Sequence, residues 1–226
     1  MCSSDLTVQF VSKNISLDNS PNGTVPGAVG LPGGTLAFEA GVITLGSNQT
    51  RIDQFANVAF TAAKGIQLQG TGGLTTPGDL TLTAPVVVGL TGADQTLVAG
   101  GAVVLNPVST TPTMAAGLGA RLAVVGASVT DNTRIQLPSG IARLEATAGD
   151  VTLGGSAVLD AGGVSKNFYD QTRYTDGGQV TLRAAQGSVE LAAGSVVNVS
   201  AQSQAGSVAL LDRKSTRLYS SHLVIS

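Results

Sequence analysis

The sequence predicts an all-β chain folded as a parallel β-helix, in which the short strands of successive coils stack on one another. Three observations lead to this prediction. A glycine-led phrase recurs along the chain, apolar residues alternate at period two within it, and valine and threonine dominate the apolar runs. A repeat built from short strands is typical of a solenoid, because each unit buries its apolar face only against its neighbours.

The repeated phrase is clearest in the second half of the chain. Gly149-Asp-Val-Thr-Leu returns as Gly187-Ser-Val-Glu-Leu after 38 residues, and the same pattern that starts at Gly178 starts again at Gly206. The 38-residue spacing aligns Val151 with Val189 and Leu153 with Leu191 inside this phrase, and two further pairs beyond it: Val158 with Val196, and Asp160 with Asn198.

Stacking of these copies explains which residue types are repeated. We expect the aligned aliphatic side chains to form inward columns, since equivalent positions of stacked strands lie about 4.8 Å apart. Glycine and asparagine suit the corners, where the backbone needs positive φ. With roughly 20–28 residues and three strands per coil, residues 7–211 would make about eight to ten coils, a rod of about 40–50 Å.

Short strands are expected in order along the chain. An antiparallel sandwich would need longer runs and tight Asn-Gly turns, and the single such pair, Asn22-Gly23, lies in a proline- and glycine-rich stretch. The alternating runs are 35–39, 42–45, 58–61, 66–68, 80–83, 102–105, 121–125, 135–137, 151–153, 180–182, 189–191 and 196–199.

Three stretches interrupt the strand pattern and are expected to be loop excursions from one continuous solenoid. Residues 19–34 contain three prolines and several glycines, and residues 107–119 are rich in threonine and proline. Residues 164–176 are polar and aromatic, and they account for the longer interval between two copies of the repeat.

The two ends differ in composition from the rest. Residues 212–222 resemble a reading frame through a common sequencing-library adapter, with Tyr219 one base from the adapter's asparagine codon. The alternative is a genuine basic tail. Residues 1–6 resemble the complementary adapter end, with a genuine start as the alternative. We therefore expect residues 1–6 and 212–226 to be adapter-derived, and the β-helix segment to occupy residues 7–211.

Charge and hydropathy exclude several classes of partner. The chain has 12 Lys and Arg against 14 Asp and Glu, a net charge of −2, and it has no cluster of basic residues. Nucleic acids and anionic membranes attract clustered basic charge, so neither is an expected partner. No apolar run approaches the roughly 18 residues of a spanning helix, so no membrane insertion is expected.

Catalytic and metal-binding chemistry is sparse. The only cysteine, Cys2, and the only histidine, His222, lie in the end segments, which excludes a Ser-His-Asp triad, a Cys-His pair and a His or Cys metal site from residues 7–211. A carboxylate mechanism stays open on four candidates, which we interpret first as outward or corner residues: Glu145, Asp150, Asp160 and Glu190. No cofactor and no metal site are expected.

The phrases 149–163 and 187–200 resemble the filamentous haemagglutinin family, very large exoproteins that Gram-negative bacteria export by two-partner secretion. The resemblance covers most of residues 34–211. It implies a right-handed β-helix shaft, non-enzymatic, on the cell surface or released from it, that serves adhesion and biofilm contacts. It also implies an outer-membrane two-partner secretion transporter as a partner, and glycans or proteins of host or bacterial surfaces as ligands.

Two alternatives come from other classes of protein. β-Helices also form polysaccharide lyases and hydrolases, which would use the carboxylates above. A self-associating autotransporter passenger domain carries similar phrases and would be followed by a membrane barrel.

The excursion 164–176 is the best candidate for a contact surface. Aromatic and arginine side chains on a loop that leaves a rigid scaffold are typical of binding surfaces, although the commoner role of such rings is to cover the apolar edge of a coil. The candidate contact residues are Phe168, Tyr169, Arg173 and Tyr174.

Overall fold

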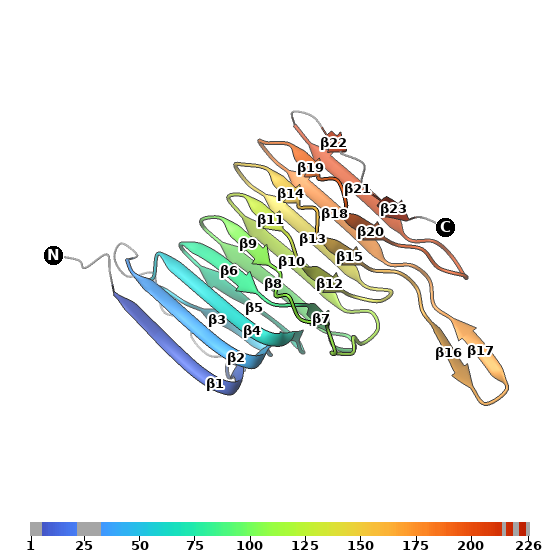
Figure 1. Ribbon diagram of the computed structural model, residues 1–226, viewed down its shortest axis with the longest axis horizontal. Coiled ribbons are helices and arrows are strands. Elements are labelled where there is room, and N and C mark those ends of the chain that lie inside the picture. The colour runs from blue at the N-terminus through green and yellow to red at the C-terminus, as the bar shows by residue number, and fades with distance from the viewer. Residues whose placement is uncertain (1–5, 22–32, 214–215, 219–221, 225–226) are drawn as a thin grey trace.

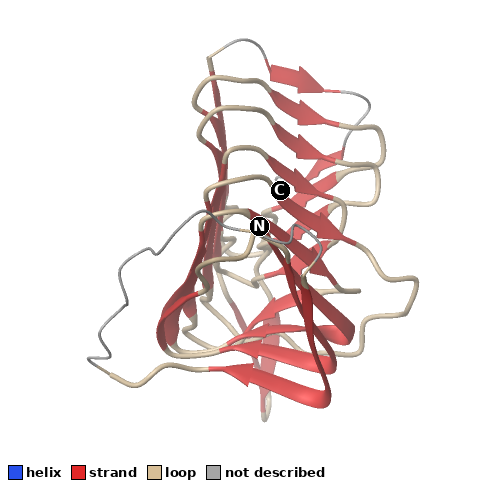
Figure 2. Cartoon of the chain, turned by 90° about the vertical axis from the view of Figure 1, so that its left-hand side faces the viewer, coloured by secondary structure: helices blue, strands red, loops and turns tan. Residues whose placement is uncertain are grey.

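A computed structural model describes residues 6–21, 33–213, 216–218 and 222–224 (Figure 1). Every regular element of these residues is a β-strand, and they include no helix that could cross a membrane. The strands stack in parallel into a β-solenoid of about eight turns (Figure 2), which confirms the predicted fold class.

Each coil visits three faces in turn. Three long strands of the amino-terminal coils each run across the first and second faces, and later coils divide this path into two short strands. The long strands are β1 (Thr7–Leu17), β2 (Thr35–Leu45) and β4 (Asn57–Leu68). The first face continues with β6 (Asp79–Thr83), β9 (Val103–Asn106), β11 (Val129–Asp131), β14 (Val151–Leu153), β19 (Val189–Leu191) and β22 (Thr216–Leu218).

The second and third faces complete the coils. The second face continues with β7 (Val87–Gly89), β12 (Arg134–Gln136), β15 (Val158–Asp160), β20 (Val196–Asn198) and β23 (His222–Val224). The third face is a separate sheet of β3 (Asn48–Arg51), β5 (Thr71–Thr76), β8 (Asp94–Ala99), β10 (Arg121–Gly126), β13 (Ile141–Ala146), β18 (Gln179–Ala184) and β21 (Ser207–Asp212).

The core consists of aliphatic columns that run along the stack. Strand residues alternate between buried and more exposed positions, as the period-two pattern predicts. Full burial of such a side chain stabilises the fold by about 1.5–3 kcal/mol. One column on the third face, in which every member is at most 2% exposed, contains Leu74, Leu97, Val124, Leu144 and Leu182.

The register predicted from the repeat is confirmed. Strands β14 and β19 pair Val151 with Val189 and Leu153 with Leu191. Strands β15 and β20 pair in parallel with the predicted register too, so that Val158 lies beside Val196 and Asp160 beside Asn198. At the matched polar position, the Asn198 side-chain amide donates to the Asp160 carboxylate at 2.9 Å. The structure thus gives this pair the ladder role expected of it.

The recurring glycines lie where two coils approach most closely. A Cβ atom at Gly178 would lie 2.0 Å from the carbonyl oxygen of Gly140, and one at Gly206 would lie 1.9 Å from that of Gly178. No side chain fits at such a distance, so glycine opens each third-face strand of these coils because the backbones touch there.

The ends and the first excursion are only partly described. Most of the excursion 19–34 and of the segment 1–6 lies outside the described residues. Within the segment 212–226, β22 and β23 pair in parallel with β19 and β20. Any chain that follows can pair with the open edges of the last coil, so this pairing does not bear on the predicted adapter origin.

Candidate functional site

The excursion 164–176 forms an antiparallel hairpin that projects from the solenoid (Figure 1). Its strands are β16 (Ser165–Phe168) and β17 (Gln171–Tyr174), and they pair only with each other. The described side chains of both strands are exposed. The hairpin is therefore outside the stack, and its described side chains do not contribute to the aliphatic columns.

The candidate contact residues lie together on this hairpin. Tyr169, at the tip, is fully exposed, Tyr174 is about half exposed, and Arg173 donates to the side chain of Gln171 at 3.1 Å. The side chain of Phe168 lies outside the described part of the structure. The described tyrosines do not cover the apolar edge of a coil, so the structure favours the interpretation of this excursion as an accessible surface.

The tip has an unusual backbone for a tyrosine. Tyr169 and Asp170 form a two-residue hairpin loop, and Tyr169 has φ of 54°. Loops of this kind with positive φ at the first position strongly favour glycine there, and an L-residue in this region costs roughly 1–2 kcal/mol. Nothing in the packing requires a large ring at a fully exposed position, so the fold gains no stability from it.

The base of the hairpin is fixed to the solenoid by hydroxyl groups. The Thr175 hydroxyl accepts the N–H of Val164 at 2.9 Å and lies 2.6 Å from the hydroxyl of Ser139, in the corner of the preceding coil. The Thr175 N–H donates to the Val164 carbonyl at 2.9 Å. These bonds set the direction in which the hairpin leaves the stack.

A hollow of about 420 Å³ adjoins this base. Leu118, Pro138 and Val164 contribute apolar side chains to its lining, while Thr91, Ser165 and Lys166 contribute polar ones. The hollow brings together the end of one excursion and the start of another, a proximity that the sequence does not reveal.

The excursion 107–119, the outer segment, lies flat over the second face. It supplies no second-face strand to its own coil. Strand β7 of the preceding coil therefore pairs directly with β12 of the following coil. Val86 and Val88 flank the inward Val87, yet both are fully buried. The outer segment covers them, and its Met114 takes the space that a side chain at Gly65 would need.

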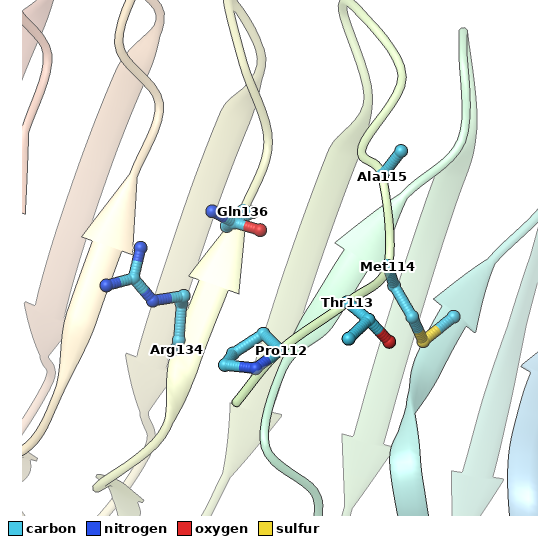
Figure 3. Close-up of a pocket in the computed structure, with 6 residues that line it drawn as sticks. All are labelled: Pro112, Thr113, Met114, Ala115, Arg134 and Gln136. Carbon is cyan, nitrogen blue, oxygen red and sulfur yellow. The ribbon is translucent and has the colours of Figure 1, made fainter. Parts of the chain in front are cut away.

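Figure 3 shows a second hollow beside the outer segment. It has a volume of about 400 Å³ and lies between Pro112–Ala115 and the side chains of Arg134 and Gln136 on β12. Its lining mixes polar and apolar side chains, and it is open to solvent. It offers no enclosed site for a reaction.

The four carboxylates considered for catalysis do not form one site. Glu145 is on the third face, where it pairs with Arg143 and Arg183. Asp160 is on the second face and accepts from Asn198. Asp150 precedes β14 of the first face and accepts the N–H of Ser188 at 2.7 Å.

Glu190 belongs to β19 of the first face. These four acidic residues are therefore spread over three faces. Among the described residues, no group of three or more metal-ligating side chains lies together.

Sequence reasoning missed one carboxylate, Asp131. It is fully buried on β11, in a column that has Leu105 and Leu153 on either side. Burial raises the pKa of this carboxyl from 3.8 to about 7, opposed by a hydrogen bond from the Thr133 backbone. The signal that could have found it is alignment of the coils, which places aspartate where its neighbours have leucine.

No known family, no curated protein and no solved structure matched this chain.

Proposed function

We propose that the chain is a segment of the shaft of a secreted bacterial surface adhesin of the filamentous haemagglutinin type, with no catalytic role. The observation that carries the proposal is a continuous aliphatic stack from which one rigidly anchored hairpin projects. A stack of this kind extends by adding coils and therefore suits a long spacer. The hairpin supplies accessible aromatic side chains on that spacer.

The hairpin tip is the proposed contact surface. Tyr169 is fully exposed in a backbone conformation that favours glycine. Residues kept in unfavourable backbone conformations cluster at functional sites, where another requirement outweighs their cost. Tyrosine suits a contact with a glycan or protein surface because its ring is large, rigid and polar at one end.

Replacement of Tyr169 by glycine tests this surface. We expect beads coated with the Tyr169→Gly variant to lose most of their adherence to epithelial and bacterial cells. The thermal melting temperature of the protein should not fall, because the hairpin lies outside the stack and glycine relieves the backbone cost at the tip. Thr152→Ala, at an outward position of the first face, is the matched control and should adhere like the original chain.

The results separate two failures. Adherence of Tyr169→Gly equal to that of the original chain would remove the hairpin tip from the contact surface. No adherence by the original chain would contradict the adhesin proposal as a whole.

Incubation of the original chain with pectin or alginate tests the alternative function. Release of unsaturated or reducing ends would favour the polysaccharide-degrading alternative.

A further inference from the structure

Asp131 is a buried carboxyl with incomplete hydrogen bonding. Its Oδ1 accepts the N–H of Thr133 at 2.9 Å, whereas its Oδ2 has no hydrogen-bond partner. The column fills the same position with Leu105 in the preceding coil and Leu153 in the following one. Packing alone would favour a leucine here, so the carboxyl needs another explanation.

No charged group of the surrounding strands compensates an ionised Asp131. β9 and β14, which pair with β11 on both sides, contain no charged residue, and Asp150 before β14 is exposed. The remaining charged residues of the strands around it alternate outward: Arg121 of β10, Arg134 of β12, Arg143 and Glu145 of β13, and Asp160 of β15. A charge without a partner in this core is costly, so the closed structure favours the neutral carboxyl.

Asp131 lies where the outer segment leaves the stack. The N–H of Asn132 donates to the carbonyl of Leu105 at 2.9 Å, two residues before the outer segment begins. The Thr133 hydroxyl donates to the carbonyl of Ala84 at 2.7 Å. This bond spans the coil in which the outer segment replaces the second-face strand. The corner 131–133 therefore joins coils that would otherwise be separated by a strand.

The outer segment is bonded to the stack mainly at its carboxyl end. There the N–H of Gly117 donates to the Gly89 carbonyl at 2.7 Å, that of Gly92 to the Leu118 carbonyl at 3.0 Å, and that of Gly119 to the Pro138 carbonyl at 3.0 Å. Earlier in the segment, the Thr110 hydroxyl donates to the Ala63 carbonyl at 3.2 Å. It has no ladder of strand hydrogen bonds. Segments with few backbone bonds open at low free energy, so a modest change at the adjoining corner can shift this equilibrium.

We propose that Asp131 is a proton-controlled latch for the outer segment. While its carboxyl is neutral, the corner 131–133 stays closed and residues 107–119 stay on β7. Loss of the proton loosens the corner and lifts the segment, which exposes Val86 and Val88. A rise in pH would therefore expose an apolar patch, Val86 and Val88, on the second face.

The direction of the effect follows from proton linkage. The closed state binds the proton more tightly than an opened, hydrated Asp131, because burial raises the carboxyl pKa to about 7. The closed state therefore loses stability as the pH rises from about 4 to about 7. Above that range both states are ionised, and the opening equilibrium no longer changes with pH.

Hydrogen exchange of the Gly117 and Gly119 amides, which donate to the carbonyls of Gly89 and Pro138 in the closed state, tests the latch, with each rate corrected for the intrinsic chemistry at pH 5.5 and pH 8.5. In the original chain we expect the opening equilibrium to increase by about tenfold or more between these values. In Asp131→Asn the increase should disappear. Asp160→Asn, which removes a carboxylate from the second face, should keep the response of the original chain.

A second variant guards against a failure of Asp131→Asn to fold. Asp131→Leu restores the aliphatic column and should hold the outer segment equally well at both pH values. An equal pH response in the original chain and in either folded variant would overturn the proposal, as would a pH-independent outer segment in the original chain. Peptides from β13 and β18 serve as internal references.

Discussion

Replacement of Val151 by aspartate should cost several kcal/mol, enough to unfold much of the chain at neutral pH. Val151 is fully buried on β14, between Val129 and Val189 of the neighbouring coils. A carboxylate at this position would have only aliphatic neighbours in its column and no counter-ion. Circular dichroism during urea unfolding measures the loss.

The matched control is Thr130→Asp, which places the same side chain at an outward position one coil away. There the carboxylate stays hydrated, and the change should stay within about 0.5 kcal/mol. Equal destabilisation by the two variants would show that the assignment of inward and outward positions is wrong.

Replacement of Gly178 by valine is the second large effect. The Cβ atom would lie 2.0 Å from the carbonyl oxygen of Gly140, so the two coils must separate at this corner. Forced overpacking costs about 1–3 kcal/mol, and more where backbone must move. We expect a loss at the upper end of this range, measured as a fall in the urea midpoint.

Gly33→Ala is the control for loss of glycine as such, because no atom lies within 4 Å of the added methyl group. It should change the free energy of unfolding by less than about 0.5 kcal/mol. A Gly178→Val variant as stable as this control would refute the close approach of the coils at the corner.

The sequence predicted those parts of the fold in which one coil repeats the next. Val151 and Val189 could be aligned because both copies keep the same residue types in the same order. Strand β5 was missed because Thr71-Gly-Gly-Leu-Thr-Thr contains a single large aliphatic residue. It is a strand because its neighbours, β3 and β8, pair with it on both sides.

Gln95 shows why β8 was also hard to predict. Glutamine at an inward position breaks the apolar alternation, but the buried Nε2 donates to the carbonyls of Gly46 and Gln69 at 2.8 and 2.9 Å. These partners lie 49 and 26 residues away, so local pattern gives no sign of them. Such long-range compensation becomes visible only once the coils are stacked.

The candidate site, too, was predictable from the sequence only in part. The composition of residues 164–176 marked the hairpin, since a run of aromatic and polar residues cannot join an aliphatic column. Its strained tip was not predictable, because φ at Tyr169 depends on how the two strands pair. The outer segment was predicted as an excursion, but its position over β7 depends on a strand that one coil omits.

The central claim is that successive coils stack in parallel with a constant rise. Pairs of spin labels in a chain without Cys2 test it by pulsed electron resonance, with one label at Thr152 and the other at Thr81, Ala37 or Gln9. These outward positions of one column are three, five and six strand spacings from Thr152.

We predict label separations that increase with coil number by about 5 Å per spacing, from about 14 Å to about 29 Å. Separations that do not increase in this order would contradict the stacked solenoid.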